Sequence, residues 1–281
     1  MIDMSLISGA IGALAPLPPT ASRLAGVVAD PKSAIDDVVE VLRFDQAITL
    51  DILRYANSAM SGSSRSITTL RDAVIRLGGA RILEQIVGRH IKGAMNNALP
   101  GYGYDENDLW RHSVAAAVAA EVICAQSNKR GAGASFTAAL LHDIGKLILG
   151  RLAPPDDMAN VWKLLLTPEL CQSCEQAERQ VLGYSHAQIG AHVAELWQLP
   201  EPIVNAIRDH HGVFTHEDQI TDTVKIANIT ARTIGQGIGN EGMQLAVDSL
   251  LAERNNISRE MFEKICVESA TRLGSVLKMF E

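Results

Sequence analysis

Hydrophobic positions recur along this chain with the period of an α-helix. Apolar residues return at intervals of three and four positions, whereas strict alternation of apolar and polar residues is scarce. Ala, Leu and Glu, which favour helices, fill many of the positions between them. Proline stands near an expected first helical position at Pro200. The pattern predicts an all-α protein, and a clear example is the run Ile35, Val38, Val39 and Leu42.

A break in the helical pattern divides the chain near residue 100. Proline, glycine and then four acidic or amide residues interrupt the periodicity over 100–108, and seven of the eight histidines come later. We therefore expect an N-terminal helical subdomain at 1–100 and a histidine-bearing helical subdomain, with C-terminal helices, at 101–281. The first part is expected to pack or to meet a partner and to contribute no catalytic group.

Length and charge bound the classes of function. A chain of 281 residues can bury a sizeable core without a disulfide or metal staple. The net charge is −7 and no stretch concentrates Lys and Arg, so direct nucleic-acid binding is disfavoured. The N-terminus lacks a basic leader, and no apolar run reaches the roughly 18 residues that a membrane span requires. We expect a cytoplasmic protein without membrane contact.

Two motifs suggest chemistry that their surroundings do not support. Cys171 and Cys174 have the spacing of redox or zinc sites, but no second pair lies nearby, so we interpret them as inert reduced thiols. The glycines at 235, 237 and 239 in TIGQGIGNEG resemble a nucleotide-binding loop, but no strand precedes them. They are interpreted as a helix stop and a loop.

Three polar side chains stand in the apolar run AALLHDIGKLIL, residues 138–149. If the run is a helix, His142 and Lys146 are four residues apart and Asp143 and Lys146 are three apart, so all three lie on one side of it. Burying them without partners would be costly. The run must therefore border a polar site to which other parts of the chain contribute.

Further polar residues stand in apolar, helix-like contexts after residue 100. Converging helices can hold imidazole and carboxylate groups around an ion, and such a donor set suits iron, zinc, manganese or nickel better than magnesium or calcium. A lone histidine is more simply a surface or core residue, and His90, His192 and His216 stay in that class. The candidate ligands are His112 in LWRHS, His142, Asp143, His186 in GYSHAQIGAHV, His210 and His211 in IRDHHG, and Asn228 in VKIANITA.

Longer motifs agree with the order of these residues. They are LAPLPPTASRL at 14–24, ILRYANSAMSG at 52–62, ITTLRDAVIRLGG at 67–79, and the stretch from ERQVLGYSHAQIG to IRDHH over 178–211. Together they resemble the HD superfamily of metal-dependent phosphohydrolases and, more closely, the HDOD family, the HD-related output domain of bacterial signalling proteins. The resemblance covers about 14–236. It implies an N-terminal helical bundle packed on an HD-type helical half.

The resemblance also implies two ligand sets, by mapping from the related HD-GYP phosphodiesterases. Asp143 would bridge one or two divalent ions, of iron, manganese or zinc. Catalytic relatives carry an aspartate where Asn228 stands, and Gly212-Val213-Phe214 replaces the extended Gly-Tyr-Pro motif, so cyclic di-GMP hydrolysis is disfavoured. The first set would be His112, His142, Asp143 and Asn228, and the second Asp143, His186, His210 and His211.

Three functions stay open at this point. The leading hypothesis is a signalling module that acts through contacts with a protein partner and retains the metal site. The alternative is a metal-dependent phosphohydrolase acting on a phosphomonoester or a nucleotide phosphodiester, in which Asp143 and Lys146 would be catalytic. The third is a sensor that binds a nucleotide or phosphate without turnover. Lys146 is explained equally well as a salt-bridge partner of Asp143 or as a solvated charge at a helix end.

Overall fold

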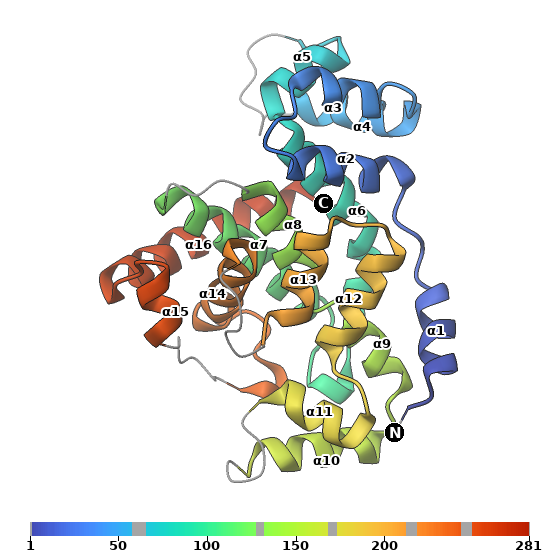
Figure 1. The fold of residues 1–281 in the computed structure, drawn as a ribbon, viewed down its shortest axis with the longest axis vertical. Helices are drawn as coiled ribbons and strands as arrows, with labels where there is room; N and C mark the ends of the chain where they lie inside the picture. Colours follow the sequence, from blue (N-terminus) through green and yellow to red (C-terminus); the bar gives the residue numbers. More distant parts are fainter. Residues whose placement is uncertain are drawn as a thin grey trace.

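The computed structural model describes residues 2–57, 66–127, 132–167, 173–211, 218–242 and 249–280. Within these ranges the regular structure is helical, apart from an isolated antiparallel bridge between Leu99 and Tyr104 (Figure 1). The prediction of an all-α protein is confirmed. No helix in the described ranges is both long and apolar enough to cross a membrane.

The first helices of the chain form a layer beside the histidine-bearing half. In Figure 1, α3, α4 and α5 lie together at one end, and α2 and α6 lie between them and the rest of the molecule. The buried positions of α3 are Val38, Val41 and Leu42. Of the predicted apolar face, Val38 and Leu42 are buried, Val39 is partly buried and Ile35 is exposed. Those helices are α2 (Pro19–Ala29), α3 (Ile35–Leu42), α4 (Gln46–Ala56), α5 (Leu70–Leu77) and α6 (Gly79–Met95). Helix α1 (Met4–Gly12) lies apart from them and packs against α9 (Gly145–Leu152).

The rest of the molecule is built around α7 (Asp108–Gln126), which packs against α8, α14 and α16. Alanines fill the middle of α7, and their small side chains let these neighbours approach closely. The remaining elements are η2 (Pro100–Tyr102), α8 (Ala132–Leu141), α9 (Gly145–Leu152), α10 (Pro155–Leu165), α11 (Cys174–Leu182), α12 (His186–Leu196), α13 (Glu201–Asp209), α14 (Gln219–Thr233), η3 (Gly239–Glu241), α15 (Ser249–Arg254) and α16 (Arg259–Met279).

The two parts of the chain are packed together. Helices α2 and α6 contact α8, and the Ser22 hydroxyl donates to the backbone carbonyl of Trp197 at 2.6 Å. The core is continuous across this junction, since buried residues from both parts belong to one hydrophobic cluster. The packing agrees with the expected role of the N-terminal helices, and the division at residue 100 stays a prediction.

The apolar run 138–149 is two helices and not one. Helix α8 ends at Leu141, a turn follows, and α9 begins at Gly145. A Cβ atom on Gly145 would overlap the backbone carbonyl of His186, so only glycine lets α9 lie this close to the start of α12. The break turns His142 and Asp143 into the interior instead of leaving them on the side of a straight helix.

Local capping fixes two further segments near the site. The Ser185 hydroxyl accepts from the backbone of Gln188, whose side chain accepts from the backbone of Ser185, so this capping box starts α12 at His186. Pro200 precedes α13 at its first turn, as the sequence predicted. The capping box therefore sets where His186 enters its helix.

Candidate metal centre

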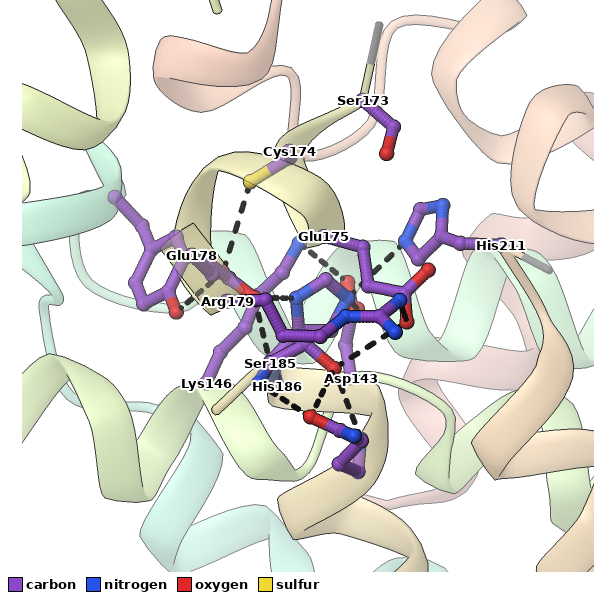
Figure 2. Close-up of polar contacts among 12 residues, drawn as sticks. Asp143, Lys146, Ser173, Cys174, Glu175, Glu178, Arg179, Ser185, His186 and His211 are labelled. Carbon is purple, nitrogen blue, oxygen red and sulfur yellow. Dashed lines mark hydrogen bonds and ion pairs between the residues drawn. The ribbon is translucent and has the colours of Figure 1, made fainter. Parts of the chain in front are cut away.

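Five histidines and one aspartate converge from separate elements of the fold. His112 lies on α7, His186 at the start of α12, and His210 and His211 directly follow α13. His142 and Asp143 occupy the turn between α8 and α9. All are buried except His211, which is partly buried. Figure 2 shows His186 and His211 lying near Asp143 from two of these elements.

The first group comprises His112, His142 and Asp143. The two imidazole Nε2 atoms are 3.2 Å apart, and they lie 3.5 Å and 3.3 Å from Asp143 Oδ2. Two donors bound at about 2.1 Å to a shared ion stand roughly 3.0 to 3.4 Å apart in octahedral or tetrahedral coordination. These three atoms therefore have the spacing of neighbouring ligands of one ion.

The second group uses the other oxygen of Asp143. Its Oδ1 atom lies 3.4 Å from His186 Nε2 and 3.7 Å from His210 Nε2. His186 Nε2 is also 3.4 Å from His210 Nε2 and 3.1 Å from His211 Nε2. Asp143 thus gives one oxygen to each group, which is the arrangement of a carboxylate that bridges two positions.

Hydrogen bonds on the outer side of the rings orient the histidines. A ring nitrogen that faces an acceptor carries the proton, which leaves the lone pair on the opposite nitrogen. For His112 and His142 the Nε2 atoms then both carry lone pairs, so their approach to 3.2 Å is not a hydrogen bond, and a shared cation would relieve it. Three Nδ1 atoms donate to backbone carbonyls: His112 to Gln236 at 3.0 Å, His142 to Ala139 at 2.7 Å, and His210 to Ile207 at 2.7 Å.

His186 is oriented by a carboxylate instead. Its Nδ1 atom and its backbone N–H donate to Glu178 Oε2 at 2.6 Å and 2.7 Å. The other oxygen of Glu178 accepts from Tyr102 at 2.8 Å and lies 3.6 Å from the Cys174 sulfur (Figure 2). Burial alone would lower the pKa of His186, but the Glu178 carboxylate outweighs it and raises that pKa. This partner makes His186 the most basic donor of its group.

The electrostatics of the centre suit cation binding. Burial lowers the pKa of His112 to about 3, although Asp143 opposes the shift, and burial holds the pKa values of His210 and His211 well below the ordinary range. Burial would raise the pKa of Asp143, but the neighbouring His142 and Lys146 outweigh it and keep that pKa very low. At neutral pH the site therefore offers the neutral imidazoles of His112, His210 and His211 and the ionised carboxylate of Asp143.

The oxygens of Asp143 test whether an ion fits. Both are buried and accept no well-aligned hydrogen bond within the described residues, although Lys146 Nζ approaches Oδ2 to 2.9 Å as an ion pair. Buried carboxylate oxygens without donors are costly, and a divalent ion would satisfy them. The imidazole and carboxylate donors suit a transition metal. The residues present therefore fit such an ion.

Asn228 lies on α14, the helix that packs against α7 and α8. Its side-chain oxygen is buried and accepts no hydrogen bond from the part of the chain that the structure describes. Asn228 thus offers an unused neutral oxygen on a helix beside that of His112. Its assignment to the first ligand set stays a prediction.

Lys146 is fully buried, so the interpretation as a solvated helix-end charge is wrong. Besides Asp143, its ammonium contacts Glu241 and the Tyr104 hydroxyl, the latter at 3.3 Å. Glu241 in turn pairs with Arg232. Glu241 and Arg232 were not among the residues predicted from sequence, because nothing in a local pattern connects Lys146 to a residue 95 positions away.

Glu178 was also missed as a functional residue. It begins the quoted stretch ERQVLGYSH and stands eight residues before His186, so the motif was visible but its contact was not. Cys174 is a buried thiol whose pKa burial raises well above the ordinary value, in line with an inert thiol.

Several sequence interpretations concern residues away from the centre. His192 is exposed and lies 3.5 Å from Glu195, and His90 contacts the Ala15 carbonyl and the Trp197 ring. Neither belongs to the centre. The remaining residues that entered those interpretations lie outside the described ranges: Cys171, Gly212, Val213, Phe214 and His216.

A family model identifies the chain. The model described as the HDOD domain matches residues 14–213, which is more than half of the sequence. The chain belongs to the HDOD family. The expected resemblance is thereby confirmed over that range. A relative by sequence from Treponema pallidum (strain Nichols), named an uncharacterized protein, is 26% identical over 229 residues, which are 77% of this chain and 42% of the relative. The chain spans less than half the length of that relative.

Solved structures show the same fold. An HDOD domain protein of Geobacter sulfurreducens is 26% identical, with a TM-score of 0.61, over 99% of this chain and 95% of that one. A provisionally named signal transduction protein of Marinobacter aquaeolei VT8 is 21% identical, with a TM-score of 0.70, over 99% and 64%. A provisionally named phosphohydrolase of Shewanella amazonensis SB2B is 21% identical, with a TM-score of 0.63, over 99% and 98%. The last two share the fold with this HDOD chain.

Proposed function

We propose that this HDOD chain is a signal-transduction module that acts through protein contacts and holds a divalent transition metal at the His/Asp centre. The convergence of histidine Nε2 atoms on the two oxygens of Asp143 carries the metal part of the proposal. The signalling part is supported by the family and by the name of the Marinobacter neighbour. Iron, manganese and zinc are the metals that this donor set favours.

The chain's own residues set what the centre can do. A divalent ion bound there would supply a Lewis acid. Asp143 presents an oxygen to each group, and the Nδ1 hydrogen bonds hold the imidazoles in the binding tautomer. Lys146 is held between Asp143 and Glu241 and is fully buried, so in this conformation it positions Asp143. That engagement favours a module over an enzyme in which Lys146 contacts substrate.

The balance of charge also favours a single tightly held ion. With neutral histidines, Asp143, Glu178 and Glu241 contribute three negative charges, and Lys146 and Arg232 contribute two positive charges, which leaves −1. Binding of one divalent ion would bring the net charge of the centre to +1, and binding of two would bring it to +3. Because uncompensated buried charge is costly, a second ion would bind more weakly than the first unless an anionic ligand lay beside it.

A metal-dependent phosphohydrolase is the second candidate. The division of the Asp143 oxygens between two groups favours it, because paired ions are a common device for phosphoester hydrolysis. The provisional name of the Shewanella neighbour points the same way. A phosphate group would supply the missing negative charge. The same argument supports a sensor that binds phosphate or nucleotide without turnover.

Metal analysis combined with a substrate panel tests these functions. The full chain is purified without added metal, and its metal content is measured for wild type, His186→Gln and His192→Gln. His192 lies on the same helix as His186 but is exposed, so it is the matched control. We expect at least one equivalent of transition metal in wild type and in the control, and a clear loss in His186→Gln. Equal metal content in all three proteins would contradict the metal centre.

The same preparations are assayed with phosphomonoesters and phosphodiesters after reconstitution with Mn²⁺ or Fe²⁺. We expect no turnover above that of the metal-depleted protein. Metal-dependent turnover that His186→Gln abolishes and His192→Gln keeps would replace the module with the phosphohydrolase.

A further inference from the structure

Residues 235–242 form a segment, here called the glycine strap, that lies across the first ligand group. The strap follows α14 and includes η3. At one end the Gln236 carbonyl accepts the hydrogen bond from His112 Nδ1 at 3.0 Å, and at the other Glu241 pairs with Lys146. Gln236 and Glu241 of the strap therefore contact two side chains of the centre, His112 and Lys146.

The glycine at position 237 permits this close approach. Gly237 has φ +59°, and a Cβ atom there would lie 2.5 Å from the Cβ of His112. A side chain at this position would be strained and would also displace the strap from α7. The glycines interpreted from sequence as a helix stop thus have a second effect, which is to bring Glu241 into the buried centre.

Lys146 makes the two ligand groups unequal. Its ammonium lies 2.9 Å from Asp143 Oδ2, the oxygen of the group with His112 and His142. A cation at that position meets a buried positive charge at short range, and burial strengthens the repulsion. The other group uses Oδ1 and adds three imidazoles, of which His186 is supported by Glu178.

Glu241 opposes the effect of Lys146. Its carboxylate is buried, with one oxygen on the Lys146 ammonium and the other on the Arg232 guanidinium. It thus neutralises part of the charge that faces Oδ2 and gives the ammonium a partner other than Asp143. Without Glu241, Lys146 would be left to Asp143, and the net charge of the centre would rise by one.

We propose that the His112/His142/Asp143 group binds metal more weakly than the Asp143/His186/His210/His211 group, and that Glu241 is the positioning residue that keeps the weaker group able to bind. The inference rests on the proposed metal centre. In functional terms, the module carries one resident ion and one exchangeable ion, and the glycine strap sets the affinity for the exchangeable one. A change in metal supply would therefore change whether an ion is bound beside the glycine strap, which is partly exposed.

Co²⁺ titration of the full, metal-depleted chain tests this proposal, with calorimetry for affinity and visible absorption for coordination. The variants are Lys146→Met, Glu241→Gln and the double variant. Lys163→Met and Glu253→Gln change exposed residues of the same types and serve as matched controls. Thermal unfolding of each metal-free protein shows whether it is folded.

We expect wild type to bind two Co²⁺ ions with distinct affinities. Lys146→Met removes a positive charge beside Oδ2 and should strengthen the weaker site about tenfold, whereas Glu241→Gln should weaken it about tenfold. The stronger site should change by less than about threefold in either protein, since its oxygen is Oδ1. The double variant should return towards wild type, and the two controls should match wild type.

The outcomes separate this inference from the proposed function. Absence of saturable Co²⁺ binding in wild type would overturn the metal centre itself. Two equal sites, or weakening of the same site by both single variants, would retain the centre and overturn the role of Glu241, because a purely structural role weakens binding in both. If Lys146→Met does not fold, Glu241→Asp decides: recovery of the weaker site supports a charge effect, and behaviour like Glu241→Gln contradicts it.

Discussion

The candidate metal centre can be compared with a second cluster of charge, formed by Arg81, Glu84, Glu121 and Arg272 where α6, α7 and α16 meet. We call it the arginine–glutamate cluster. Arg81 lies 3.1 Å from Glu84 and 3.2 Å from Glu121, and Arg272 lies 2.6 Å from the other oxygen of Glu121. Both clusters join helices that are distant in sequence.

The two clusters differ in how their carboxylates are satisfied. Guanidinium groups donate to Glu84 and Glu121, so these acids use donors from the protein itself. Asp143 instead has buried oxygens that accept no well-aligned hydrogen bond within the described residues, and imidazole lone pairs converge on the same place. Buried charge therefore does not identify a binding site. What distinguishes the candidate metal centre is a set of potential metal ligands that converge without hydrogen-bond donors.

The largest expected effect is the loss of metal in Asp143→Ala. This change removes the carboxylate that both ligand groups share, and we expect metal content to fall from at least one equivalent to background. Glu121→Gln, in the arginine–glutamate cluster, is the control and should keep full metal content. Elemental analysis checks both, and retention of stoichiometric metal by Asp143→Ala would refute the ligand assignment.

Glu178→Gln should have the next largest effect. The amide can still occupy the same space, but it lacks the charge that supports His186 through its Nδ1 atom. Loss of such an outer partner typically lowers metal affinity about 10- to 100-fold. Competition with a chromophoric chelator measures the change, and exposed Glu195→Gln is the control. Unchanged affinity would show that His186 needs no charged partner.

Asn228→Asp is expected to strengthen metal binding. If its side chain belongs to the first ligand set, the substitution adds one negative charge beside a divalent ion. We then expect the metal affinity of that set to rise by about tenfold. Metal stoichiometry and hydrolysis of a generic phosphodiester are compared at equal metal supply. If neither metal stoichiometry nor hydrolysis changes, Asn228 does not belong to the ligand set. If wild type already binds two ions and hydrolyses the phosphodiester, the protein is an enzyme and the proposal of a module is contradicted.

The smallest expected effect concerns stability in the arginine–glutamate cluster. Burial, followed by the charge of Glu121, raises the pKa of Glu84 to about 8, although Arg81 opposes the shift. The native protein therefore keeps a proton that the unfolded chain releases above about pH 4.5. The stabilisation that the raised pKa of Glu84 gives to the native state is fully present below about pH 4.5 and is lost as the pH rises through about 8.

Glu84→Gln should remove this pH dependence, because an amide does not ionise. Between pH 6 and pH 9 the free energy of unfolding should fall less in the variant than in wild type, by on the order of 1 kcal/mol. Urea unfolding at a series of pH values measures it. Parallel pH profiles for the two proteins would show that Glu84 is already ionised at neutral pH.

The sequence predicted the helices and the order of the candidate ligands because both leave local signals. Apolar periodicity marks α3, and the motifs around His112, His186 and His210 mark where polar residues enter apolar segments. It could not predict that the run 138–149 bends at His142. The bend depends on the contact of Gly145 with the backbone of α12, which is a property of packing and not of the run itself.

The supporting residues were beyond local patterns for the same reason. Glu241 and Arg232 are ordinary charged residues in sequence, and their roles follow from a turn that returns the chain to Lys146. Gly237 was interpreted from sequence as part of a helix stop, because glycine occurs both where helices end and where backbones approach closely. Its close approach to His112 appears only once α7 and the strap are placed side by side.

The burial of α7 has a consequence for hydrogen exchange. Fourteen of its 19 residues are buried, so we expect its amide protons to exchange only when the whole protein unfolds. The strap, with its glycines and its short η3 turn, has few helical hydrogen bonds and should exchange through local opening. The hydrogen bond between His112 and Gln236 thus joins the slowest-exchanging helix to a fast-exchanging segment across about 3 Å.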